Sequence, residues 1–271
     1  MVDREPAMTA DAGSAPAAET TTSAAGTAAT PLFLLPLGRG TRGKTWWVRW
    51  AVDRALARGR EIVIADADRT NATLSAYFQG VVTPPSADDA EMRDWFAAFV
   101  ERQIAEQFNA LIDLGAGDLI LKQLAREIGL TAFLDRYGIR PVAVHLLGPD
   151  PDDLAYLHDV EQGELFAPAA TILVLNAALV PRNRAEKAAF QATVLEHPVF
   201  LKALERGATL VWMPRLAVAH EVDARRIAFT AAEDGKVKPG QPPIGPWNRQ
   251  LIHNWLRDME ENFAPVAHWL P

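Results

Sequence analysis

One segment of the sequence has residue types and spacing suited to binding phosphate groups. Residues 38–45 read GRGTRGKT, with Gly38 and Gly43 at the spacing of a phosphate-binding loop and a Lys-Thr pair after the last glycine. Glycines at these positions let backbone N–H groups turn inward around phosphate oxygens. Lys44 can reach the β- and γ-phosphates of a nucleotide, and the Thr45 hydroxyl can bind Mg²⁺. We call residues 38–45 the phosphate loop.

The segments on either side of the phosphate loop are those that such a loop requires. Residues 32–37 form an apolar run typical of a strand buried on both faces of a parallel sheet, and residues 44–58 show a helical pattern. The start of that helix adds the positive end of its dipole to the same spot. The alternative is a tight turn with a surface lysine. Strand, glycine loop and helix in this order favour phosphate binding.

Aspartates follow the next two apolar segments. Residues 61–68 read EIVIADAD, a short strand that ends in Asp66 and Asp68, and residues 109–114 read NALIDL, with Asp113 near the end. A strand-end aspartate downstream of a phosphate-binding loop is the Walker B arrangement, in which the carboxylate holds Mg²⁺ through water. Such an aspartate can also cap the next helix. Together with the phosphate loop, the position of Asp113 favours the metal role.

The rest of the chain alternates between strand and helix patterns. We predict strands at 32–37, 61–68, 109–114, 140–147, 171–176 and 208–213. We predict helices at 44–58, 91–107, 119–137, 182–205, 217–229 and 247–263, the fourth interrupted near His197 and Pro198. Strand, helix and strand within about 35 residues form a βαβ unit, which requires parallel strands. The predicted fold class is α/β: a doubly wound, mostly parallel sheet flanked by helices, as in P-loop NTPases.

Composition indicates how the chain is organised. Residues 1–30 are rich in Ala, Thr, Ser and Gly and have almost no large apolar side chains, so we predict a disordered tail there and one NTPase domain at 31–271. Of the 271 residues 49% are hydrophobic, which is enough for a sizeable core. The chain has no cysteine, which excludes thiolate metal sites and thiol nucleophiles.

Charge and hydropathy bear on partners and compartment. The 27 basic and 34 acidic residues give a net charge of −7, so no global attraction to nucleic acid or anionic membranes is expected. No apolar run reaches about 18 residues, so no transmembrane helix is expected. The apolar residues of 247–263 recur at helical spacing beside a slightly acidic polar face, so we expect this helix to pack on the core and not on a membrane. We expect a cytoplasmic location.

The order and spacing of these motifs resemble the ParA/MinD group of deviant P-loop ATPases over about residues 31–229. That group has a K-G-G-x-G-K-[ST] loop, an aspartate pair after the second strand, a Walker B aspartate and a late strand that ends in Asn. Here the loop reads RGTRGKT, the aspartate pair is Asp66 and Asp68, the Walker B residue is Asp113, and LVLN ends at Asn176.

Two further pieces of the sequence carry the same resemblance. The turn that contains Pro214 resembles the adenine-side loop of the group. Residues 68–73 read DRTNAT and are similar to a piece found in ParA-like ATPases of conjugative-transfer operons.

The resemblance implies ATP and Mg²⁺ as cofactors and a role for each site residue. Lys44 binds the β- and γ-phosphates, Asp68 positions or activates the attacking water, and Arg39 completes the catalytic set. Thr45 binds the metal, with Asp66 and Asp113 supporting it. Asn176 hydrogen-bonds the adenine. The implied nucleotide-binding residues are Gly38, Arg39, Gly40, Thr41, Arg42, Gly43, Lys44, Thr45, Trp46, Asn176 and Pro214.

The resemblance also implies a reaction and partners. The chain is expected to hydrolyse ATP to ADP and phosphate, with low activity in the absence of a partner. A homodimer is implied, with DNA or a plasmid-partition or conjugative-transfer protein as a partner. The ATP cycle would then serve to position or transfer plasmid DNA or a protein complex.

Two residues depart from the pattern of the group and keep alternatives open. The signature lysine, which reaches across an ATP-sandwich dimer, is replaced by Arg39, which retains the charge but not the geometry. The second glycine of the pattern is replaced by Thr41, whose side chain is expected to crowd the partner's phosphates. One alternative is therefore a nucleotide-binding scaffold that hydrolyses ATP poorly. Another is a small-molecule kinase or ligase of the same loop class.

Other polar clusters point less clearly to chemistry. The six histidines show no close metal-ligand spacing, so we expect no zinc site. The acidic run Asp150, Asp152 and Asp153 is interpreted as a solvated helix start. The basic residues Arg182, Arg184, Lys187, Arg215, Arg225 and Arg226 are candidate DNA contacts, although scattered surface arginines are the favoured interpretation.

Overall fold

The computed structural model describes Met1 and residues 30–68, 73–114, 119–162 and 165–271. The predicted disordered tail therefore falls almost wholly outside the described residues, as do positions 69–72 of the DRTNAT piece. Among the described residues, no helix is both long enough and apolar enough to cross a membrane.

The fold is built on one six-stranded sheet in which every neighbouring pair of strands is parallel. The strands are β1 (Leu32–Leu37), β2 (Ile62–Asp66), β3 (Asn109–Asp113), β4 (Arg140–Leu147), β5 (Ala170–Asn176) and β6 (Thr209–Met213). Their order in the sheet is β2-β3-β1-β4-β5-β6. The predicted doubly wound α/β fold is thus confirmed, and a parallel sheet brings the ends of all six strands to the same edge.

The central strands are almost completely buried because helices cover both of their faces. Every residue of β1 and β5 is buried, and β4 is buried after its first residue. The sequence of β1 includes Pro36, which cannot donate a backbone hydrogen bond. Pairing of β1 with β4 runs along its whole length, whereas its register with β3 covers Phe33 and Leu34.

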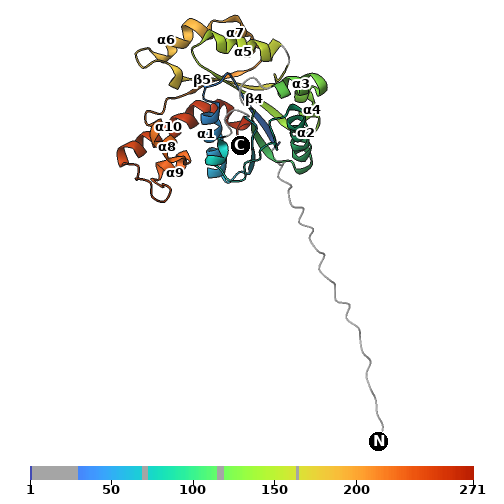
Figure 1. The fold of residues 1–271 in the computed structure, drawn as a ribbon, viewed down its shortest axis with the longest axis horizontal. Helices are drawn as coiled ribbons and strands as arrows, with labels where there is room; N and C mark the ends of the chain where they lie inside the picture. Colours follow the sequence, from blue (N-terminus) through green and yellow to red (C-terminus); the bar gives the residue numbers. More distant parts are fainter. Residues whose placement is uncertain (2–29, 69–72, 115–118, 163–164) are drawn as a thin grey trace.

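One face of the sheet is covered by four helices (Figure 1): α1 (Lys44–Ala57), α8 (Ala219–Arg225), α9 (Phe229–Glu233) and α10 (Pro246–Phe263). The core on this side includes Trp50 of α1, Ile252 and Met259 of α10, and Val144 of β4. A short 3₁₀ segment, η4 (Ala264–Trp269), follows α10.

The opposite face carries the remaining α-helices: α2 (Asp89–Glu106), α3 (Leu119–Ile128), α4 (Leu130–Arg136), α5 (Pro151–Gln162), α6 (Glu186–Phe190) and α7 (Pro198–Glu205). Phe33 of β1, Phe96 of α2 and the loop residue Phe166 pack here with ring centroids 6.0–6.1 Å apart. Two 3₁₀ segments, η1 (Leu74–Ala76) and η2 (Ala177–Leu179), and the π-helical η3 (Gln191–Leu195) complete the fold.

Two predicted helices are interrupted at a residue with positive φ, and a third is interrupted near His197 and Pro198 as we predicted. Gly129 has φ +61° and separates α3 from α4 within the predicted helix 119–137. The predicted helix 182–205 begins at Glu186 and passes through η3 before α7 starts at Pro198. Arg226 has φ +48° and ends α8, so α9 is a separate helix.

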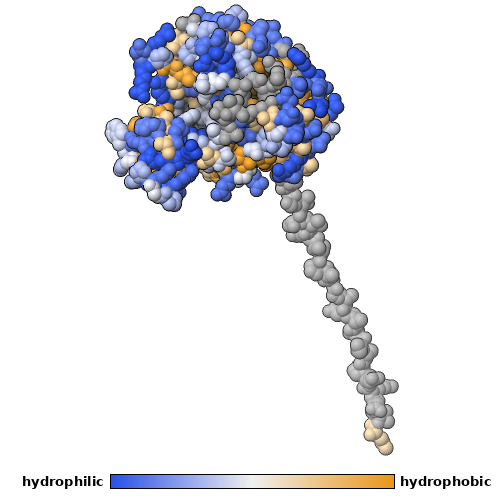
Figure 2. Space-filling model, in the orientation of Figure 1, coloured by the Kyte–Doolittle hydropathy of each residue, from blue (hydrophilic) through white to orange (hydrophobic). Residues whose placement is uncertain are grey.

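The apolar face of α10 packs on the core, as predicted. Ile252, Trp255, Met259 and Phe263 are buried. Trp247, which we placed on the same face, is instead 78% exposed at the start of the helix. Figure 2 shows a largely hydrophilic surface with small apolar patches.

Candidate functional site

The phosphate loop connects β1 to α1 and needs glycine at both of its ends. Gly38 has φ +143°, and a Cβ atom there would lie 2.8 Å from the Leu146 carbonyl oxygen of β4. Gly43 has φ +93°, and a Cβ atom there would lie 2.4 Å from the Asn176 Nδ2 of β5. Both conformations and both contacts exclude a side chain. The glycine spacing in the sequence thus reflects close packing of the loop against two strand ends.

Lys44 lies inside the loop and is 7% exposed. Its Nζ donates to the carbonyl oxygens of Gly38, at 3.0 Å, and Arg39, at 3.4 Å. Burial lowers the pKa of Lys44, and the nearby carboxylates of Asp113 and Asp68 oppose that shift. The structure therefore brings the predicted phosphate-binding lysine near two of the predicted acidic site residues.

The start of α1 supplies backbone donors to the same place. Among the described residues no side chain caps the helix, and its first turn has no acidic residue. Uncapped N–H groups at the N-terminus of a long helix attract anions. These amides and the Lys44 ammonium together form a cationic site beside the loop.

Thr41 takes up a conformation that favours glycine. Its φ is +64°, and its Oγ1 donates to the Gly40 carbonyl oxygen at 2.6 Å. A β-branched residue in this region is strained. The side chain is exposed. The departure at Thr41 from the glycine of the ParA/MinD pattern therefore has a backbone cost. The predicted crowding of a partner's phosphates stays a prediction.

Two arginines of the loop are held by the acidic run at the start of α5. Arg42 contacts Asp153 and Asp150, each at 2.6 Å, and Arg39 contacts Asp152 at 3.2 Å and Asp150 at 3.4 Å. The Asp153 side chain is 1% exposed, and it also accepts from the Gly148 amide at 2.8 Å. The Asp153 carboxylate is thus a buried anchor of the phosphate loop.

Our interpretation of this acidic run as a solvated helix start is therefore wrong for Asp153. Burial raises the pKa of Asp153, and the Gly148 amide and Arg42 oppose that shift. The error arose because β4 precedes the run and lies next to β1 in the sheet, a pairing that connects distant parts of the sequence. The sequence did contain a signal. The acidic run directly follows a predicted strand, and residues that follow a parallel strand lie at the same edge of the sheet as the phosphate loop.

The residues predicted to hold Mg²⁺ lie at the ends of neighbouring elements. Asp66 and Asp113 pair in register on β2 and β3, both 2% exposed, and Thr45 is the second residue of α1. Asp66 accepts from the amides of Leu74 at 2.9 Å and Asp68 at 3.3 Å, so it also fixes the loop after β2. Burial raises the pKa of Asp66, and the Leu74 amide opposes that shift.

The donor chemistry fits magnesium bound together with phosphates. Hydroxyl and carboxylate oxygens are its preferred ligands, and Mg²⁺ usually takes one or two carboxylates plus substrate phosphates. Within the described part of the chain, no group of three or more acidic or histidine side chains could hold a metal ion. Thr45 and Asp113 match such a partial ligand set. The metal role predicted for Asp66 stays a prediction.

A cavity of about 220 Å³ lies beside the phosphate loop, and we call it the Asn176 cavity. Its lining includes Gly43, Trp46, Asn176, Pro214, Asp223 and Trp255. The Asn176 Nδ2 donates to the Arg42 carbonyl oxygen at 3.0 Å, and its Oδ1 accepts from the Ala178 amide at 3.0 Å.

Two more of the predicted nucleotide-binding residues line this cavity and are tied to Trp255. The Trp255 Nε1 donates to the Pro214 carbonyl oxygen at 2.8 Å. The Trp46 ring packs against those of Phe229 at 5.1 Å and Trp255 at 6.2 Å. The structure thus brings the loop, Asn176, Pro214 and Trp46 together, and it shows Asn176 binding the loop backbone.

Two of the candidate DNA-contacting residues, Arg215 and Arg225, are engaged within the fold. The Arg215 guanidinium donates to the carbonyl oxygens of Ala177 and Val180. Arg225 is 9% exposed and is paired with Glu221. These two side chains hold loops and a helix in place.

No protein-family model matches the sequence, and no curated protein matches it. Among solved structures, the MinD cell division protein of Aquifex aeolicus is 13% identical, with a TM-score of 0.47 over 85% of this chain and 97% of that chain. The cell division protein FtsY of Thermotoga maritima is 14% identical, with a TM-score of 0.39 over 83% of this chain and 68% of that one. At such low identities and TM-scores these likenesses say nothing about the chemistry of this chain.

Proposed function

We propose that the chain binds ATP with Mg²⁺ at the phosphate loop and hydrolyses it to ADP and phosphate. The observation that carries the proposal is Lys44, a buried ammonium whose hydrogen bonds go to two backbone carbonyls of a glycine loop. A buried cation is costly unless an anion offsets its desolvation. The phosphates of ATP would supply that anion, with the amides of α1 as further donors.

Each end of the nucleotide has a place in this proposal. The triphosphate lies along the phosphate loop, and the base enters the Asn176 cavity beside Trp46 and Pro214. Thr45 and Asp113 would hold Mg²⁺, which would supply positive charge to neutralise the phosphates. Gly38, Gly40 and Gly43 let the backbone approach the phosphates.

The reaction requires positioning and charge neutralisation and no covalent intermediate. A water oxygen forms a bond to the γ-phosphorus, and the bond from that phosphorus to the β,γ-bridging oxygen breaks. Asp68 orients the water, whose proton leaves with the phosphate product, and Lys44 stabilises the charge that builds on the phosphates. Burial of Lys44 near Asp68 supports this division of roles.

The finer assignment follows the resemblance to the ParA/MinD group. We infer a cytoplasmic ATPase whose nucleotide cycle positions plasmid DNA or a protein complex, as in partition or conjugative transfer. A homodimer with nucleotide at the interface would be the active form. The resemblance in the order and spacing of the motifs supports this assignment.

A second candidate, a nucleotide-binding scaffold with little hydrolysis, is favoured by the surroundings of Arg39. Its guanidinium lies within salt-bridge distance of Asp150, Asp152 and Asp153 of the same chain. An arginine neutralised in this way is not free to reach the phosphates of a partner subunit. The loop strain at Thr41 points in the same direction.

One experiment separates the two candidates. ATP turnover is measured with and without DNA over a range of protein concentrations, for the wild type and for Asp68→Ala. The ATPase predicts turnover per chain that rises with concentration and is lost in Asp68→Ala while ATP binding remains. The scaffold predicts ATP binding without turnover at every concentration. Asp94→Ala, whose side chain is 82% exposed on α2, is the matched control and is expected to behave as wild type.

A further inference from the structure

Arg49 is a buried cation on α1, five positions after Lys44, and its side chain is 3% exposed. Its Nη1 contacts the Asp223 carboxylate at 2.6 Å, and its Nη2 donates to the Ile227 carbonyl oxygen at 3.4 Å. Its Cζ lies 3.8 Å from the Tyr77 ring centroid. The ring centroids of Phe229, at 4.9 Å, and Trp46, at 5.0 Å, also lie close to it. We call these three rings and Asp223 the Arg49 cage. Planar stacking and a charged hydrogen bond therefore hold the guanidinium from several directions.

One side of this cage belongs to the Asn176 cavity. Asp223 and Trp46 both line the cavity, and the Asp223 side chain is 44% exposed while Arg49 holds one of its oxygens. A carboxylate can accept further hydrogen bonds, and Asp223 lines the cavity that we propose for the nucleoside. Arg49 thereby fixes which way the Asp223 carboxylate points.

The other side of the cage belongs to the segment that carries Asp68. Tyr77 directly follows η1, whose first residue, Leu74, donates its amide to Asp66. Asp66 also accepts from the Asp68 amide. Asp66 thus links Asp68 to η1, and Arg49 contacts the residue that follows η1, Tyr77.

We infer that Arg49 is a positioning residue that sets both halves of the nucleotide site at once, a role that rests on the proposed ATPase function. Through Asp223 it orients an acceptor for a hydrogen-bond donor of the nucleoside, either a base amine or a ribose hydroxyl. Through Tyr77 it fixes η1, which Asp66 links to Asp68, the residue proposed to orient the water. Lysine cannot replace it, because an ammonium lacks the planar face and the two-nitrogen fork.

The same helix offers a matched control. Arg54 is also buried, but it contacts Glu260 and the Pro271 carbonyl oxygen, and neither residue lines the Asn176 cavity. Arg54→Lys therefore tests what the loss of a buried guanidinium of α1 does to stability alone.

The test measures Kd for ATP, single-turnover hydrolysis and melting temperature for four variants of the full chain. Asp223→Asn is expected to raise Kd about tenfold and to change hydrolysis less than about threefold. Tyr77→Leu is expected to slow hydrolysis about tenfold with Kd nearly unchanged, because small displacements of a catalytic group are costly. Arg49→Lys is expected both to raise Kd and to slow hydrolysis. Arg54→Lys is expected to leave Kd and hydrolysis unchanged.

Nucleotide analogues identify the donor that Asp223 reads. Purine riboside triphosphate lacks the amine of the base, and 2′-deoxy- and 3′-deoxy-ATP each lack one hydroxyl. One of these analogues is expected to bind wild type about tenfold more weakly than ATP and to lose that penalty in Asp223→Asn. Equal penalties in both proteins for all three analogues would overturn the Asp223 half of the inference.

The outcomes distinguish this inference from the proposed function. Normal ATP binding and hydrolysis by Arg49→Lys, with a melting temperature lowered as in Arg54→Lys, would overturn the inference and leave the ATPase intact. If the wild type binds ATP but does not hydrolyse it, the part of the inference in which Tyr77 supports hydrolysis would be overturned. A wild type that binds no ATP would overturn the ATPase proposal and this inference together.

Discussion

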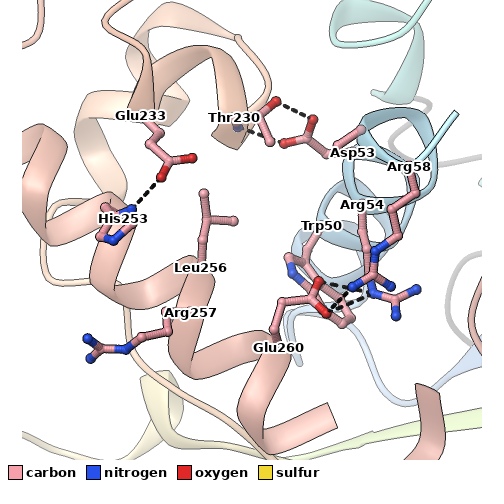
Figure 3. A pocket seen from close by; sticks show the side chains of 11 residues that line it. Trp50, Asp53, Arg54, Arg58, Thr230, Glu233, His253, Leu256, Arg257 and Glu260 are labelled. Atoms are coloured by element: carbon pink, nitrogen blue, oxygen red, sulfur yellow. Dashed lines mark hydrogen bonds and ion pairs between the residues drawn. The ribbon is translucent and has the colours of Figure 1, made fainter. Parts of the chain in front are cut away.

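The two ends of α1 each bury a cation, and the partners of the two cations differ. Lys44, in the first turn, and Arg54, in the last, are both 7% exposed. Lys44 donates to two neutral carbonyls. Arg54 contacts the Glu260 carboxylate at 3.0 Å (Figure 3) and also contacts the Pro271 carbonyl oxygen at 2.5 Å. Equal burial therefore does not mean an equal role. The charge of the hydrogen-bond partners distinguishes the two cations.

The two cations differ in how much an added anion would stabilise each of them. Arg54 is stabilised within the folded chain by its own carboxylate, so an added anion has little to gain there. Burial lowers the pKa of Lys44, and the nearby carboxylates of Asp113 and Asp68 oppose that shift. A phosphate bound at the start of α1 would offset the desolvation free energy of the buried Lys44 ammonium.

The largest expected effect is the loss of ATP binding in Lys44→Ala. Removing one partner of a buried, charged contact costs about 2–5 kcal/mol, so we expect Kd to rise about 30-fold or more. The free energy of unfolding should change by less than about 1 kcal/mol, because the variant also loses a buried charge. Calorimetric titration with ATP and urea denaturation measure the two quantities. An unchanged Kd in a folded variant would remove the phosphate loop assignment.

The opposite pattern is expected for Arg54→Ala. Its guanidinium is buried while the Glu260 side chain is 40% exposed, so loss of the pair should lower the free energy of unfolding by about 2 kcal/mol and leave Kd for ATP unchanged. Arg58→Ala is the control, because Arg58 contacts the same carboxylate at 2.7 Å but is 41% exposed, and we expect less than about 0.5 kcal/mol. Equal losses in the two variants would contradict the comparison.

His145 of β4 extends the comparison to a buried base whose two ring nitrogens have no hydrogen-bond partner among the described residues. Burial, with a smaller effect of Arg206, lowers the pKa of His145 from 6.5 to about 3. The unfolded chain therefore binds the proton first as pH falls. Stability from this group is complete above pH 6.5 and is lost progressively toward pH 3.

We expect His145 to cost the wild type about 2 kcal/mol of folding stability between neutral pH and about pH 5. His145→Leu should remove most of that slope, as seen in urea denaturation at a series of pH values. His220→Gln, with a side chain that is 76% exposed, should keep the slope. A slope that is the same in all three proteins would mean that other groups account for the loss in acid.

The smallest expected effect concerns the strain at Thr41. Thr41→Gly relieves a positive φ at a β-branched residue, so we expect the free energy of unfolding to rise by about 1 kcal/mol with Kd for ATP within about twofold. Thr41→Ala keeps a Cβ atom and should not show the gain. If alanine stabilises as much as glycine, the strain does not lie in the backbone.

Much of the fold could be predicted because its signals are local. Apolar runs mark the strands, and the glycine spacing of the phosphate loop marks the turn into α1. The breaks at Gly129 and Arg226 were missed because a helical pattern continues across each of them, while the backbone takes a positive φ. Pattern alone does not show where a helix stops.

The site was harder to predict wherever it depends on distant pairs. Asp153 is 111 positions from Arg42, and Asp223 is 174 positions from Arg49. A single arginine in a helix ordinarily indicates a solvated face, so nothing in the sequence marked Arg49 as buried. Strand order creates the first contact, and the packing of α8 on α1 creates the second. Neither can be deduced from spacing along one chain.

The place of β1 in the sheet has a consequence for how the protein is made. β1 is synthesised well before its neighbours in the sheet, because β3 and β4 begin at residues 109 and 140. At roughly 5–20 residues per second, the run LFLLPL waits for several seconds without its partners. Pro36 lies within this run, and a proline interrupts the backbone pairing that drives aggregation of exposed apolar strands. The proline at the centre of the sheet thus protects the nascent chain at the stage when it is most exposed to misassembly.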